Sequence, residues 1–201
     1  QPPANPSPAE VRESLLAETR STATNWKEPP QEVERKVAGA AEIYDASIAK
    51  GYDPTTSKQL GYGALRAPIA QLDSIVSISK SVLDSVDLSQ APMDSILKGE
   101  VLTQLSISQS MGANPDKIQE MSKALVDMSP DLSKAMASDI NVGKQVLGTV
   151  TASMNDGLPV DQAKQRGDQL IALGGQLDAK GYTVEDRNIA MPAAGTALTS
   201  G

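Results

Sequence analysis

The chain has 201 residues with no Cys, His or Phe, only one Trp and four Tyr, and a formal net charge of -7 at pH 7. Without Cys and His it lacks the thiolate and imidazole ligands of most transition-metal sites and the histidine base of the common nucleophilic triads. The acidic balance disfavours nucleic acid and anionic membrane surfaces as partners, because both attract clusters of Lys and Arg. No apolar run reaches the roughly 18 residues that a membrane-spanning helix needs.

The N-terminal part of the chain predicts an extended arm followed by two helices. Residues 1–7 are rich in Pro, which is typical of an extended polyproline-like segment. Ser7-Pro8-Ala9-Glu10 then combines an N-cap, a Pro at the first helical position and the Glu of a capping box. The helix that begins there should end before Pro29. A second helix is expected from Pro30 to about Lys50, with Gly51 as its stop.

The next segment predicts a turn, a loop and a long amphipathic helix. Asp53-Pro54 opens a short helical turn, and Gly61-Tyr62-Gly63 indicates a loop, so that the helical domain could subdivide near 61–67. From Pro68 to Val86, apolar residues recur at spacings of three and four, as on one face of a helix. The stripe is broad, which suits a central helix that packs against more than one neighbour.

Two segments also fit a competing interpretation as strands. Apolar and polar residues alternate within 74–82 and again within 101–109, as they would in a half-exposed strand. The alternation is short, whereas the helical spacing continues through the whole segment from Pro68. Helix is therefore the favoured interpretation for both.

The second half of the chain predicts a series of further helices, each with its own start signal. An N-cap oxygen, a Pro without an amide proton and an early acidic residue all stabilise the first turn of a helix. Thr183 should begin one more turn, and the small, uncharged segment 191–201 is expected to be a flexible tail. The predicted starts are Ala91-Pro92, Asn114-Pro115, Ser129-Pro130, Asp139 and Pro159.

These elements define an all-α protein. We expect about six to eight helices in an irregular bundle or in stacked helical hairpins, with one helical domain over residues 8–190. Aromatic side chains bury the largest areas, so their scarcity predicts a thin core of Leu, Ile, Val, Ala and Met. Such a core could be completed by a partner.

A four-residue segment occurs twice, as Ala49-Lys50-Gly51-Tyr52 and Ala179-Lys180-Gly181-Tyr182. Each copy follows a predicted long helix and precedes a new cap. An internal duplication would explain the match. So would the general preference of helix ends for Lys followed by Gly, which is the favoured explanation.

The remaining chemistry favours a non-enzymatic structural or protein-interaction role, with binding to a partner chain or to copies of itself in a secreted or virion-like assembly. An interaction domain of a secreted bacterial effector or adhesin is an alternative, as is a carrier of an apolar small ligand. A hydrolase or lyase that uses paired carboxylates would need two acids facing each other across a cleft. The acids considered for it are Glu10, Glu42, Asp45 and Glu120.

The candidate partner-binding residues are the single Trp and a set of Met residues. Trp26 could cover the core at a helix end or anchor an interface, where Trp is over-represented. The Met side chains could fill gaps in the core or form an adaptable groove. The set comprises Met93, Met111, Met121, Met128, Met136 and Met154.

No catalytic residue, cofactor or metal ligand is predicted. The partners expected are a protein or the chain itself, not nucleic acid, and no membrane span is expected. A chain that starts at Gln1 and has no Cys fits an exported, processed protein, so an extracellular or periplasmic location is expected. A cytoplasmic fragment of a larger protein is the alternative.

Overall fold

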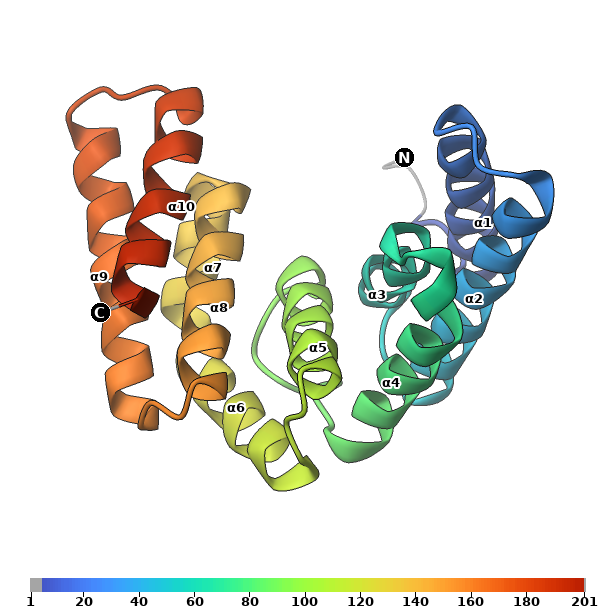
Figure 1. Ribbon diagram of the computed structural model, residues 1–201, viewed down its shortest axis with the longest axis horizontal. Helices are drawn as coiled ribbons and strands as arrows, with labels where there is room; N and C mark the ends of the chain where they lie inside the picture. The colour runs from blue at the N-terminus through green and yellow to red at the C-terminus, as the bar shows by residue number, and fades with distance from the viewer. Residues whose placement is uncertain (1–4, 201) are drawn as a thin grey trace.

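The computed structural model describes residues 5–200 and places them in ten α-helices and one short 3-10 helix, without a strand in this range (Figure 1). The all-α prediction is confirmed, with more helices than expected. The elements are α1 (Pro8–Asn25), α2 (Pro30–Ala49), α3 (Pro54–Arg66), the 3-10 helix Ile69–Gln71, α4 (Leu72–Ser85), α5 (Ser95–Ser110), α6 (Pro115–Asp127), α7 (Ser129–Ser138), α8 (Ile140–Asn155), α9 (Val160–Ala179) and α10 (Val184–Ser200).

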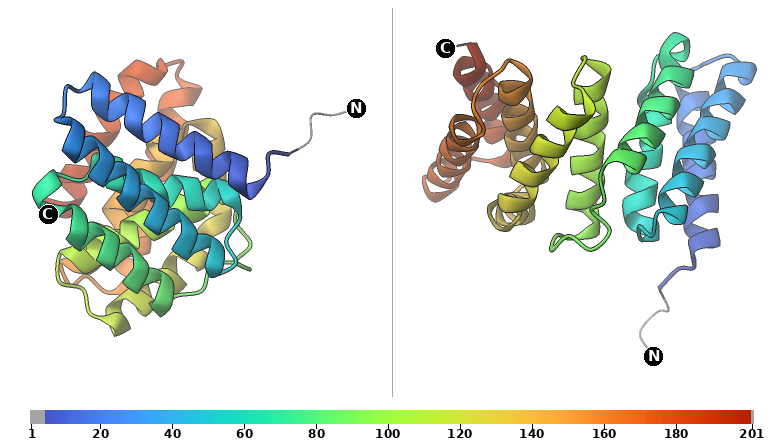
Figure 2. Two further views of the ribbon diagram at one scale, coloured as in Figure 1. Left: turned by 90° about the vertical axis from the view of Figure 1, so that its right-hand side faces the viewer. Right: turned by 90° about the horizontal axis from the view of Figure 1, so that it is seen from below.

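The helices follow one another along the long axis of the molecule. The first two, in blue, lie at one end and the last two, in orange and red, at the other (Figures 1 and 2). Contacts join mainly helices that are close in the chain, and α5 connects the two halves because it packs against α3 and α4 on one side and α8 on the other. One continuous hydrophobic cluster runs from α1 to α10, with a small separate cluster of Ala23, Val33 and Leu65.

Helix starts largely follow the predicted capping signals. Ser7 and Glu10 form the expected capping box of α1, and Asn114 and Asp139 cap α6 and α8. The predicted start at Ala91-Pro92 is wrong, because α5 begins only at Ser95. The carboxylate of Asp94 accepts a hydrogen bond from the Leu97 amide at 2.8 Å, and this cap sets the true start.

The predicted loop at Gly61-Tyr62-Gly63 is wrong, as is the prediction of only a short turn after Asp53. Both segments belong to α3, a helix of 13 residues. A Cβ atom at Gly61 would lie 2.6 Å from Leu15 Cδ2 and 3.4 Å from the carbonyl oxygen of Ala40. The glycine therefore lets α3 approach α1 and α2 closely and does not serve a turn.

The end of the chain also differs from its prediction. Helix α10 continues through residues 191–200, which were expected to form a flexible tail, and Met191 is buried. A Cβ atom at Gly195 would lie 2.9 Å from the hydroxyl oxygen of Thr149, so α10 packs closely on α8. Of the expected N-terminal arm, residues 5–7 are exposed and not helical, and residues 1–4 lie outside the described part of the chain, as does position 201.

The two segments with alternating apolar and polar residues are helical, as favoured. Segment 74–82 lies in α4 and 101–109 in α5. Ser79, Ser106 and Ser108 are buried, so three of the polar positions hold small side chains inside the packed helices. The hydroxyl of Ser106 donates to the Leu102 carbonyl at 2.9 Å, which satisfies it within its own helix.

The repeated segment ends a helix in the same way both times. Gly51 and Gly181 have φ values of 88° and 77°, in the left-handed region that glycine adopts without strain. The Tyr residues that follow differ. Tyr52 is buried and its hydroxyl accepts a hydrogen bond from the Leu88 amide at 2.8 Å, whereas Tyr182 is about half exposed. The two copies of the segment therefore resemble each other because both end a helix.

Two glycines in α8 should respond oppositely to alanine. A Cβ atom at Gly143 would lie 3.1 Å from the Cα atom of Met136 in α7, whereas a Cβ at Gly148 would meet nothing within 4 Å. We expect Gly143→Ala to lower the free energy of unfolding by about 1–2 kcal/mol through overpacking. Gly148→Ala should raise it by about 0.5–1 kcal/mol through helix propensity. Urea denaturation of both variants measures the difference, and equal effects would contradict the close packing of α7 on α8.

Candidate interaction site

Trp26 lies at the turn between α1 and α2 and is 55% exposed. Its ring lies over the ammonium group of Lys36, with the nitrogen 5.7 Å from the ring centre. Lys36 is buried and donates hydrogen bonds to Glu28 at 2.5 Å and to the carbonyl of Leu65 at 3.0 Å. Trp26 therefore covers the buried ammonium group of Lys36 while leaving much of its own surface accessible.

The Met residues are dispersed and do not line one common groove. Three of them, Met121, Met128 and Met154, are buried in the core, and Met93 and Met136 are partly buried against it. Met111 differs because it is 67% exposed, at the C-terminal end of α5.

The carboxylates considered for acid–base chemistry each have a local partner. Glu42 pairs with Lys80 at 2.6 Å, Asp45 with Arg12 at 2.8 Å, and Glu120 with Lys117 at 3.2 Å. Glu10 caps α1, and its hydrogen bonds with the backbone and side chain of Ser7 lower its pKa. A general acid of a hydrolase needs a raised pKa, so the contacts of Glu10 do not suit it to that role.

One cluster between α1 and α3 contains a Ser and a Lys in contact. Lys58 donates to the hydroxyl of Ser14 at 3.0 Å and to Glu18 at 2.9 Å, and Tyr62 donates to Glu18 as well. Burial lowers the pKa of Lys58, but the hydrogen bond with Glu18 and the other partners outweigh it and raise the pKa overall. The ammonium group therefore stays protonated and is unsuited to act as a general base for Ser14.

Two findings bear on metals and membranes. In residues 5–200, no group of three or more acidic side chains comes together in a way that could hold a metal ion. The prediction of no membrane span is confirmed for the same range, because none of its helices combines sufficient length with sufficient apolarity to cross a bilayer.

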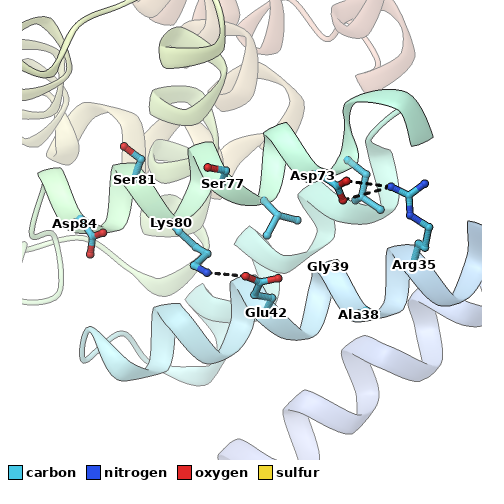
Figure 3. A pocket seen from close by; sticks show the side chains of 11 residues that line it. Arg35, Ala38, Gly39, Glu42, Asp73, Ser77, Lys80, Ser81 and Asp84 are labelled. Carbon is cyan, nitrogen blue, oxygen red and sulfur yellow. Dashed lines mark hydrogen bonds and ion pairs between the residues drawn. The ribbon is translucent and has the colours of Figure 1, made fainter.

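A charged groove of about 740 Å³ runs between α2 and α4 (Figure 3). Arg35 pairs with Asp73 at 3.3 Å and Glu42 with Lys80 at 2.6 Å, and both pairs bridge the two helices. A Cβ atom at Gly39 would lie 3.1 Å from Val76, so the glycine allows this close approach. The groove's charges largely satisfy one another, which leaves few of them to recognise a ligand.

A second groove, of about 210 Å³, has an apolar lining and lies where α3, α4 and α5 meet. We call it the apolar groove. Small side chains at the junction leave space between the three helices, and larger apolar side chains form the walls. Its lining residues are Leu60, Gly63, Arg66, Ala67, Pro68, Ile75, Ile78, Ser79, Thr103, Ser106, Ile107 and Ser110.

The rim of the apolar groove carries an exposed apolar side chain and an exposed cation. Ile107 is 44% exposed on α5, and Met111 follows one helical turn later. Arg66 is exposed at the end of α3 and forms no ion pair with any residue in the range 5–200. The apolar groove therefore combines an exposed Ile side chain with a guanidinium that has no acidic partner within residues 5–200.

Comparisons with protein-family models, with curated proteins and with solved structures found no match for this chain.

Asp53 illustrates how charge contributes to the stability of α3, next to this groove. Burial opposes ionisation of Asp53, but hydrogen bonds with Thr56 and Ser95 outweigh it, so its pKa lies below the ordinary value of 3.8. A lowered pKa contributes stability that is fully present above the unfolded-state pKa and is lost as the pH falls through the folded-state pKa.

We therefore expect Asp53→Ala to cost about 1 kcal/mol of unfolding free energy at neutral pH, through loss of the N-cap. The difference from the wild type should shrink as the pH falls below the ordinary pKa of 3.8, because protonation removes the part of the cap's contribution that depends on charge. Urea denaturation across this pH range measures it. A difference that stays constant down to strong acid would show that the carboxylate charge does not matter.

Proposed function

We propose that this chain is a non-enzymatic protein-interaction protein that binds an apolar helical segment in the apolar groove. The observation that carries the proposal is the apolar wall that Ile75, Ile78 and Ile107 contribute at the meeting of three helices, where Ile107 is exposed and the other two are partly exposed. Grooves between helices commonly take the apolar face of an amphipathic helix, whose side chains insert at spacings of three and four.

The size and the apolar lining of the groove suit a side chain that a partner inserts into it. A volume of about 210 Å³ suits one or two large apolar side chains and is less than most drug-sized ligands occupy. The groove opens to the surface, so a helix could lie across it. Among the surfaces considered, the charged groove between α2 and α4 offers mostly paired groups, and the buried Met residues are out of reach.

The stacked, hairpin-like succession of helices suits such a role. Each helix packs mainly on its neighbours in the chain, which leaves long helix faces at the surface and positions the groove on a rigid framework. Within this proposal, the chain is a scaffold with a recognition surface, and its interaction partners determine where it acts.

The experiment is a display selection of helical peptides against the full chain, followed by affinity measurement by calorimetry. We expect enriched peptides to carry apolar residues at spacings of three and four. Ile107→Glu should weaken their binding at least about tenfold, because it places a charge in the apolar wall.

The matched control is Ile96→Glu. Ile96 lies on the same helix and is similarly exposed, but it does not line the groove. Binding that is equally weakened by both variants, or by neither, would contradict the proposal. Saturable binding of a small apolar molecule with no peptide enrichment would instead support a ligand carrier.

A further inference from the structure

The described chain carries a second exposed apolar feature, on α10. Ile189 is 76% exposed, the largest fraction among the large apolar side chains of residues 5–200. Glu185 lies one helical turn before it, is exposed and forms no ion pair within the same range. Because residues four apart share one side of a helix, the Ile and the Glu form a ridge with one apolar and one acidic side chain.

This ridge complements the apolar groove in apolar character and in charge. The ridge offers a single branched apolar side chain, and the groove has space for one or two. Within residues 5–200, neither the acid of the ridge nor Arg66 at the rim of the groove has an ion-pair partner. Arg12, Arg20, Arg35 and Arg187 have acidic partners, and Arg166 donates a hydrogen bond to the hydroxyl of Ser153 at 3.2 Å.

We propose that the apolar groove is occupied by α10 of a second copy of this chain. Ile189 of one copy enters the groove between α4 and α5 of the other, and Glu185 pairs with Arg66 at the rim. This inference rests on the proposed function, because it names the occupant of the same groove.

The contact joins two different surfaces, since the ridge and the groove lie on different parts of each copy. Such a heterologous contact either closes into a ring or small oligomer or continues into an open chain of copies. Two chains of net charge -7 also repel each other, so the association depends on local complementarity.

Sedimentation velocity of the full chain from about 1 µM to about 1 mM covers the range of weak to moderate affinities. We expect concentration-dependent association. Ile189→Lys should weaken this association at least about tenfold, since the side chain that enters the groove becomes charged. Ile96→Lys adds the same charge at an exposed Ile outside both surfaces and should leave association unchanged.

A charge exchange tests the ion pair separately. Arg66→Glu alone and Glu185→Arg alone should each weaken association about fivefold, and the double variant should restore it, because each copy then presents the reversed pair. A wild-type chain that stays monomeric to about 1 mM would overturn the inference, as would Ile189→Lys behaving like Ile96→Lys. If selected peptides still bind at the Ile107 wall in that case, only the identity of the occupant is wrong. If they do not, the proposed function fails with it.

Discussion

Replacing Arg187 with Ala should lower the free energy of unfolding by about 3–5 kcal/mol, the cost of leaving a buried charge without its partner. Arg187, on α10, is buried and pairs with Asp139 at 3.6 Å and with Asp178 at 2.6 Å. Asp139 is buried as well and Asp178 is largely exposed. The variant therefore leaves the carboxylate of Asp139 in the interior without a cation.

This ion pair also positions the last helices relative to one another. Asp139 caps α8, Asp178 lies near the end of α9, and Arg187 brings both to α10. Its geometry is imperfect, because the Nε atom of Arg187 and the Oδ2 atom of Asp139 are too far apart for a hydrogen bond and find no other partner in the described residues. We therefore expect the three helices to loosen together.

Urea denaturation followed by circular dichroism measures the loss, and hydrogen exchange locates it in α8 to α10. The control is the double variant Arg187→Met and Asp139→Asn, which removes both charges and keeps an amide oxygen as the cap of α8. It should recover most of the stability. A cost below about 1 kcal/mol for Arg187→Ala would show that the pair contributes no more than a surface ion pair does.

Replacing Lys36 with Ala should have the second-largest effect, with a loss of about 3 kcal/mol in unfolding free energy. The ammonium group of Lys36 is buried between Glu28, the Leu65 carbonyl and the ring of Trp26. Its removal leaves Glu28 partly buried, with its second carboxylate oxygen already unpaired within the described residues. It also removes the cation that the Trp26 ring covers.

Trp26 is the only Trp of the chain, so its fluorescence reports directly on this site. Urea denaturation monitored by Trp emission and by circular dichroism should show the loss, together with a changed emission spectrum of the folded variant. The double variant Lys36→Met and Glu28→Gln removes both charges while keeping similar volumes and should be more stable than Lys36→Ala. An unchanged folded spectrum in Lys36→Ala would contradict the contact between ring and ammonium group.

Local signals in the sequence predicted helix starts well, because a cap acts within three residues of itself. The capping box of Ser7 and the caps at Asn114 and Asp139 needed no tertiary information. The glycines of α3 were misinterpreted because a glycine serves both turns and close helix contacts, and only the position of Leu15 distinguishes the two at Gly61. The part of α10 beyond Met191 was not predicted, because the role of its small residues is evident only from their packing against α8.

The candidate site was less predictable for a related reason. A Met on a helix face has the same spacing whether it packs inward or outward, so Met111 could not be distinguished from the buried Met154. The apolar groove combines three separated segments, near 60–68, 75–79 and 103–110. Only the apolar stripe of α4 gave a sign of the groove. Ile75 and Ile78 widen this stripe, so that it is broader than the neighbouring helices can cover.

Recognition at the apolar groove should change the environment of the isoleucines that line it. Methyl NMR of the full chain with labelled Ile, titrated with a peptide from the display selection, tests it most directly. We expect the signals of Ile75, Ile78 and Ile107 to shift together with one dissociation constant while that of Ile96 stays in place. Shifts confined to other isoleucines, or none at saturating peptide, would contradict it.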